Sequence, residues 1–114
     1  MRIAVTIDDL PLWPKSYPPA GYTAEGIVAS IRSALKENGI SSVYAFSNSW
    51  PLQEHPEYSK ILDDWVADGH HVAKHTHSHF DLPDISAEAF IADIDAAKHH
   101  LASELIKGHL EKLL

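Results

Sequence analysis

The chain has 114 residues, about the size of one ordinary domain, and its 45% hydrophobic and 22% charged content is normal for a globular protein. The formal net charge is −7, no two lysines or arginines are adjacent, and no stretch approaches the ~18 apolar residues of a membrane span, so neither a nucleic-acid nor a membrane partner is expected. The sequence contains no cysteine, which excludes disulfides and leaves histidine and carboxylate to hold any metal ion.

The first part of the chain predicts a strand followed by a helix. Residues 2–7, RIAVTI, are β-branched and mostly apolar, which is typical of a strand buried on both faces, and Pro11 stops it. The chain enters this strand directly and shows no signal-peptide pattern, so we expect a cytoplasmic location. Thr23 is the predicted N-cap of a helix that continues to about Asn38 and stops at Gly39, with an apolar stripe of Ile27, Ile31, Ala34 and Leu35.

The pattern of strand and helix then repeats twice. Residues 42–46, SVYAF, predict a second buried strand. Pro56 begins a second predicted helix, which ends at Gly69 and whose inward-facing side chains are Ile61, Leu62, Trp65 and Val66. Residues 70–75, HHVAKH, predict a third, shorter strand. Ser86 then caps a long helix with a break at Gly108. The apolar stripe of this helix is Phe90, Ile94, Ala97, Leu101 and Leu105.

This βαβαβα order predicts an α/β fold with parallel strands and right-handed crossovers. No internal repeat or domain boundary is visible in the sequence. Three strands are few for a parallel sheet, because both of its faces must be covered. We therefore expect this chain to be part of a larger fold.

Two polar clusters follow the first and third predicted strands, IDDLP and HTHSH. Because function gathers at the carboxyl ends of parallel strands, both clusters are expected on the same rim of the sheet. Asp8 and Asp9 are adjacent, so a regular strand would send them to opposite faces, and they can share one site only where the strand ends. The alternative is that this pair caps a loop or begins a turn, as aspartate often does.

Three histidines alternate in KHTHSH: His75, His77 and His79. On an extended strand, residues four apart are separated by about 13 Å, too far for two zinc–nitrogen bonds of about 2.1 Å. A helical turn after His75 would bring His75 and His79 onto one face, with His77 directed elsewhere. The alternative is that this segment is a polar, exposed loop that binds no metal ion.

Together these motifs resemble the polysaccharide deacetylases, also called the NodB-homology domain. The family has an Asp-Asp pair ending its first strand, here VTIDDLP, and a His-Ser/Thr-x-x-His motif after a later strand, here within GHHVAKHTHSHFDL. The resemblance covers roughly residues 2–105. Three positions differ from the residues that are common in the family: Leu10, Lys74 and Phe80.

The resemblance implies a partial (β/α) barrel of the deacetylase type, with residues 1–114 as the N-terminal portion of the domain. It implies Asp8 as the catalytic base, and Asp9, His75 and His79 as ligands of a divalent metal ion, by preference Zn²⁺. Such a three-ligand site leaves a position open for water. The implied activity is a metal-dependent hydrolase that removes acetyl groups from N-acetylated carbohydrates.

The family's arginine-proline motif and its late histidine, which usually supplies the general acid, are not found in the sequence. We therefore expect a deacetylase truncated before its later motifs, with little activity of its own. Two alternatives remain: a hydrolase of another non-peptide C–N bond in a small cyclic amide or ureide, and a non-catalytic metal-binding remnant. A partial barrel leaves sheet edges without neighbours, which predicts a homo-oligomer.

Other aromatic and histidine side chains lie outside the two motifs. Loop aromatics near the expected rim offer apolar faces for a sugar ring or for simple packing: Trp13, Tyr17, Tyr22 and Trp50. The histidines at 70 and 71 begin the third strand and are expected to be structural. Those in the last helical stretch are expected at the surface or at helix ends: His99, His100 and His109.

Overall fold

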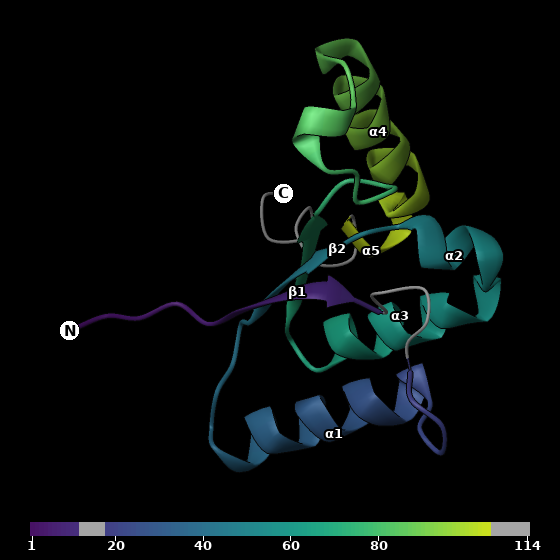
Figure 1. The fold of residues 1–114 in the computed structure, drawn as a ribbon. Coiled ribbons are helices and arrows are strands. Elements are labelled where there is room, and N and C mark those ends of the chain that lie inside the picture. The colour runs from purple at the N-terminus through teal and green to yellow at the C-terminus, as the bar shows by residue number, and fades with distance from the viewer. Residues whose placement is uncertain (12–17, 106–114) are drawn as a thin grey trace.

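The computed structural model describes residues 1–11 and 18–105 (Figure 1). Its sheet has three parallel strands in the order β1-β2-β3, namely β1 (Thr6–Leu10), β2 (Tyr44–Ser47) and β3 (His71–Lys74). The register pairs Thr6 with Tyr44 and Tyr44 with His71, so the three carboxyl ends lie along one rim. The predicted α/β class and parallel order are confirmed.

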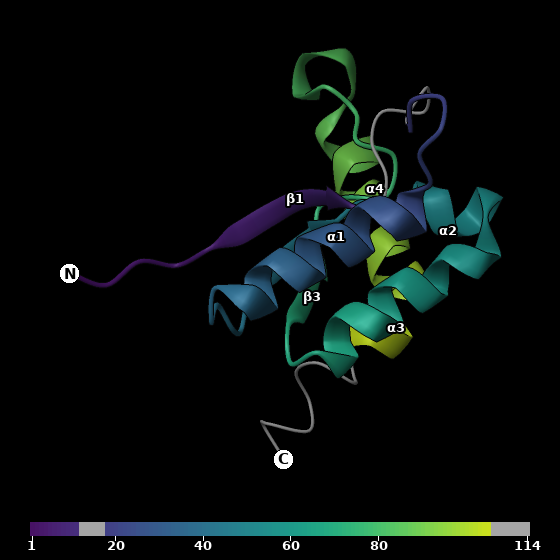
Figure 2. The same cartoon turned by 90° about the horizontal axis from the view of Figure 1, so that it is seen from below.

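Helices alternate with these strands along the chain. They are α1 (Ala24–Glu37), α2 (Trp50–Glu54), α3 (Ser59–Ala67), α4 (Ala87–His100) and α5 (Ala102–Leu105), with short 3-10 helices η1 (Pro56–Tyr58) and η2 (Leu82–Asp84). In both views α1 and α3 lie side by side (Figures 1 and 2). Of the helices in the described residues, none has the length and apolar character needed to cross a membrane.

Two helices begin where the sequence predicted. The hydroxyl of Thr23 accepts a hydrogen bond from the Gly26 N–H at 3.0 Å, and that of Ser86 accepts one from the Ala89 N–H at 3.1 Å. Each cap satisfies one of the N–H groups that the first helical turn leaves without a partner.

The hydrophobic core lies between the sheet and the helices. Val43, Ala45 and Val72 meet Leu62 and Trp65 there. The indole N–H of Trp65 donates to the backbone carbonyl of His71 at 3.0 Å, so this large side chain is buried without an unpaired donor. The inward side chains predicted for α3 are buried or packed against this core. In α1, Ala34 is exposed, contrary to prediction, and Ala24 and Val28 are buried with Leu35.

The predicted first strand is wrong in its bounds and its burial. β1 begins at Thr6 and continues to Leu10, while Ile3 and Val5 are 79% and 37% exposed. Pairing with β2 starts only at Thr6, and the residues before it extend away from the rest of the molecule (Figures 1 and 2). Apolar, β-branched composition therefore does not make a strand here, since a strand needs a neighbour to receive its hydrogen bonds.

Two helical segments also differ from the prediction. The helix α2 has no counterpart among the predicted elements, and Pro56 begins η1 whereas α3 starts at Ser59. The long C-terminal helix is interrupted at Leu101, whose fully buried side chain lies between α4 and α5. The break predicted at Gly108 lies outside the described residues.

Candidate metal centre

Asp9 occupies an irregular position within β1. The pairing of β1 with β2 shifts register between Asp8 and Leu10, and Asp9 has φ 67°, in the left-handed region. Such a bulge breaks the regular alternation of side chains along a strand. The predicted strand of residues 2–7 stops short of the Asp-Asp pair, whereas β1 includes both aspartates and ends at Leu10. A bulge close to this end releases Asp9 from the alternation.

The histidine motif lies in a tight bend after β3. Thr76 and His79 have φ 66° and 55°, and the Thr76 hydroxyl accepts a hydrogen bond from the His79 N–H at 3.2 Å. The bend is not the helical turn considered from the sequence, yet it brings the same pair together: the ring centroids of His75 and His79 are 5.2 Å apart. Residues held in this region of backbone space often occur at functional sites.

The bend crosses the end of β2 to reach β1. β1 and β3 both neighbour β2, so they are two strand spacings apart, roughly 10 Å. Backbone hydrogen bonds tie the bend to the segment that follows β2: His75 N–H to Ser47 O at 2.9 Å, Ser49 N–H to Thr76 O at 3.3 Å, and Trp50 N–H to His77 O at 3.0 Å. This path places the histidines over the rim, within reach of Asp9.

Asp9, His75 and His79 converge on one point. Oδ1 of Asp9 lies 3.5 Å from His75 Nε2 and 3.3 Å from His79 Nε2, and one donor atom from each residue lies within 4.8 Å of the others. Asp8, the residue before Asp9 on β1, is exposed and lies outside this group of three. The three side chains define the candidate metal centre.

The chemistry of these residues fits a divalent transition ion. Asp9 Oδ1 is buried and accepts no hydrogen bond within the described part of the chain, which is costly for a carboxylate oxygen unless a cation neutralises it. Two imidazoles and one carboxylate are ligands that suit zinc. A cavity of about 250 Å³ adjoins the group and is lined by His75, Thr76, His79, Phe80 and Phe90.

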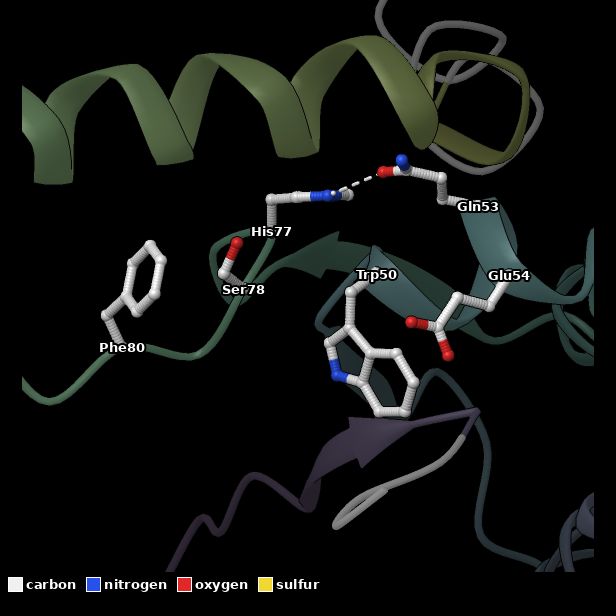
Figure 3. A pocket seen from close by; sticks show the side chains of 6 residues that line it. All are labelled: Trp50, Gln53, Glu54, His77, Ser78 and Phe80. Atoms are coloured by element: carbon white, nitrogen blue, oxygen red, sulfur yellow. Dashed lines mark hydrogen bonds between the residues drawn. The ribbon is translucent and has the colours of Figure 1, made fainter.

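His77 is directed away from this centre. Its Nε2 lies 3.0 Å from Gln53 Oε1 (Figure 3). Its Nδ1 lies 2.8 Å from the Ser49 hydroxyl. Because the amide oxygen only accepts, Nε2 carries the proton and Nδ1 accepts from Ser49. Burial lowers the pKa of His77, as does His100, which stacks on it at 4.8 Å, while Asp93 acts in the opposite direction. These effects favour the neutral form of the ring, which lies between α2 and α4.

A second cavity of about 410 Å³ adjoins His77 and is lined by Trp50, Gln53, Glu54, His77, Ser78 and Phe80 (Figure 3). Trp50 is only 6% exposed and belongs to the hydrophobic core, so packing accounts for most of its surface. Tyr22 is 65% exposed, and Trp13 and Tyr17 lie outside the described residues.

The remaining histidines divide between the core and the surface. His70 and His71 are buried, and the Val43 N–H donates to His70 Nδ1 at 3.2 Å, so the structural role expected of them fits. His99 and His100 are exposed near the end of α4, and His109 lies outside the described residues.

Asp93 on α4 is a site residue that the sequence reasoning missed. It is 7% exposed, and its Oδ2 accepts hydrogen bonds from the backbone N–H groups of His77 and Ser78, both at 2.9 Å. A signal was present, because Asp93 lies three residues after Phe90 and four before Ala97, on the apolar face of the predicted helix. A carboxylate on such a face needs a partner elsewhere in the fold.

Comparison with known proteins identifies the family. The profile of the family described as polysaccharide deacetylase matches residues 1–108. Among solved structures, a T48 deacetylase with substrate shares 21% identity and a TM-score of 0.60, over 89% of this chain and 42% of that one. A second similar structure is the Bc1960 peptidoglycan N-acetylglucosamine deacetylase in complex with 4-naphthalen-1-yl-N-oxidanyl-benzamide. It shares 20% identity and a TM-score of 0.64, over 90% of this chain and 40% of that one.

The chain thus spans about two fifths of the length of these two structures. A search of the curated proteins gives no match. At these identities the likeness to the solved structures is one of fold, and it agrees with the partial (β/α) barrel predicted from the sequence. The family profile covers nearly the whole sequence, and the chain therefore belongs to the polysaccharide deacetylase family.

Proposed function

We propose that residues 1–114 form the N-terminal, metal-binding portion of a deacetylase that removes acetyl groups from N-acetylated carbohydrates. The observation that carries this proposal is the convergence of Asp9, His75 and His79, with a buried Asp9 oxygen that accepts no hydrogen bond in the described residues. The family assignment supports the reaction class. The peptidoglycan N-acetylglucosamine substrate named for the Bc1960 structure supports an amino sugar as the substrate class.

In this proposal Asp9, His75 and His79 hold the divalent ion, and zinc suits the two nitrogens and one oxygen that they offer. A zinc ion bound there would polarise the amide carbonyl and lower the pKa of water. The bend of residues 75–79 and the bulge at Asp9 bring these three side chains within reach of one ion.

Asp8 is proposed as the general base. It is the exposed residue directly before Asp9 on β1 and is not one of the three proposed ligands, so its carboxylate is available to accept a proton from the attacking water. Loss of the amine from the tetrahedral carbon also needs a general acid. We assign no residue of this chain to that role. The matched region is 42% and 40% of the two solved deacetylases, and we propose that the acid lies outside it.

The test is a titration of Zn²⁺ with variants of the 114-residue chain. Asp9→Ala, His75→Ala and His79→Ala should each bind Zn²⁺ far more weakly than the wild type, whereas His77→Ala and the exposed His99→Ala should retain most of the affinity. Acetate release from N-acetylglucosamine oligosaccharides, measured on protein expressed from the complete gene, then tests the reaction. Equal Zn²⁺ affinity in the wild type and in both His75→Ala and His79→Ala would overturn the proposed site.

A further inference from the structure

The buried carboxylate of Asp93 holds the middle of the bend formed by residues 75–79. Asp93 Oδ2 accepts from two consecutive backbone N–H groups, those of His77 and Ser78, at 2.9 Å each. Both donors lie between His75 and His79 in the sequence, and the acceptor comes from the middle of α4. Hydrogen bonds to a charged acceptor are stronger than those between neutral groups. Asp93 therefore fixes the middle two of the four peptide units that separate the candidate ligands.

The bend needs such support because its backbone is unfavourable. Thr76 and His79, on either side of the two N–H groups, both have positive φ values, 66° and 55°. For residues other than glycine, such conformations cost on the order of 1–3 kcal/mol each and persist only when the surroundings enforce them. The backbone bonds from Ser49 and Trp50 hold the carbonyls of Thr76 and His77 on one side of the bend, and Asp93 holds the N–H groups on the other.

We propose that Asp93 is a positioning residue for the metal centre. By holding the N–H groups of His77 and Ser78, it keeps the bend in the conformation that directs His75 and His79 toward Asp9, without contacting the ion itself. This inference rests on the proposed function, because it assumes that these two histidines are ligands. It predicts that the loss of Asp93 weakens metal binding although all three ligands remain present.

The experiment measures Zn²⁺ affinity by competition with a chromophoric chelator, together with hydrogen exchange of the His77 and Ser78 amides, in the full 114-residue chain. Asp93→Ala should lower the affinity about 10- to 100-fold, the range typical for partners that orient metal ligands, and should expose both amides to exchange. Asp93→Asn keeps an acceptor oxygen in nearly the same place but loses the charge, so its affinity should fall between those of Asp93→Ala and the wild type.

Two controls separate positioning from other effects. Asp95→Asn makes the same change of charge at an exposed position of the same helix and should leave the affinity unchanged. Val28→Ala opens the core in α1, away from the bend, so it should lower the thermal midpoint and leave the affinity unchanged. If Asp93→Ala fails to fold, Asp93→Asn decides, because it retains the shape of the side chain.

The outcomes distinguish this inference from the proposed function. If Asp93→Ala, or Asp93→Asn where the alanine variant does not fold, binds Zn²⁺ as tightly as the wild type while His75→Ala does not, the positioning role is overturned and the metal site stands. If Val28→Ala weakens binding as much as Asp93→Ala at equal loss of stability, Asp93 acts only through the fold, and the inference is again overturned. If His75→Ala binds as tightly as the wild type, the metal site itself is wrong.

Discussion

Nε2 of His79 lies 3.3 Å from Oδ1 of Asp9, although the two residues belong to segments on either side of β2. The contact exists because the bend after β3 crosses the end of β2 and because a bulge frees Asp9 from the regular alternation of β1. An imidazole and a carboxylate at this distance have room to approach a common ion with small movements of their side chains.

Zn²⁺ should stabilise the folded chain. A ligand that binds only the native state adds about 2.7 kcal/mol to the free energy of unfolding when its concentration is 100 times its dissociation constant. We expect urea unfolding of the wild type to shift to higher denaturant with Zn²⁺ but not with Ca²⁺, which prefers an all-oxygen site. His79→Ala should unfold at the same urea concentration with and without Zn²⁺. Equal stabilisation of the wild type by both ions would contradict a site made of two histidines.

Asp8 should be separable from the metal ligands. Asp8→Asn is expected to retain Zn²⁺ affinity, because Asp8 lies outside the group of three that converges. Turnover of an N-acetylated oligosaccharide, measured on protein from the complete gene, should fall about 10²- to 10⁴-fold, which is the usual contribution of a general base. Loss of Zn²⁺ in this variant would instead make Asp8 a metal ligand.

His70 should make stability depend on pH. Burial lowers its pKa, as do His71 and Arg32, against the opposing effect of Asp68. The unfolded chain, in which a histidine has a pKa of about 6.5, then binds protons more readily than the folded chain. The free energy of unfolding should therefore decrease as the pH falls below about 6.5 and level off below the folded pKa. Nδ1 of His70 accepts a hydrogen bond from the Val43 N–H. Protonation of Nδ1 would turn it into a donor that faces this N–H, and such a buried mismatch costs about 1–3 kcal/mol.

The measurement for His70 is urea unfolding between pH 5 and pH 8 for the wild type and His70→Asn. The asparagine oxygen can accept the same N–H but does not titrate, and the contributions of the other histidines cancel in the difference between the two proteins. The two profiles should therefore converge as the pH falls. Parallel profiles over this range would show that His70 is protonated equally readily in the folded and unfolded chains.

The 114-residue chain is expected to self-associate. β1 and β3 are the outer strands of the described sheet, and each has an edge without a strand neighbour among the described residues. Such edges recruit other chains, and the apolar Ile3 and Val5 lie exposed directly before β1. Sedimentation velocity over a concentration series should show a dimer at tens of micromolar.

Replacing Val5 with lysine should weaken this association, because a charge beside an open strand edge opposes pairing with another chain. Ile91→Lys serves as the control, since it adds the same charge at an exposed position of α4. A wild-type chain that stays monomeric throughout the series would exclude the association.

The amino-acid sequence by itself determined the order of the elements, two of the helix starts and the candidate ligands. These rest on local signals. Thr23 and Ser86 cap helices through contacts three residues away, and alternating strand and helix patterns imply parallel pairing at any distance. His75 and His79 were selected by their spacing and by the resemblance to a family motif, and the structure brings both beside Asp9.

Only the tertiary structure decided how these residues are held. The start of β1, the bulge at Asp9 and the role of Asp93 each depend on a partner from a distant part of the chain. A β-branched segment becomes a strand only where a neighbour receives its hydrogen bonds, so residues 2–5 have strand-like composition without strand structure. An aspartate in a helix has the same local preferences whether it faces water or the backbone of a loop. The contact of Asp93 with the bend was therefore decided by the packing of α4. A carboxylate buried there without such a partner would be too costly.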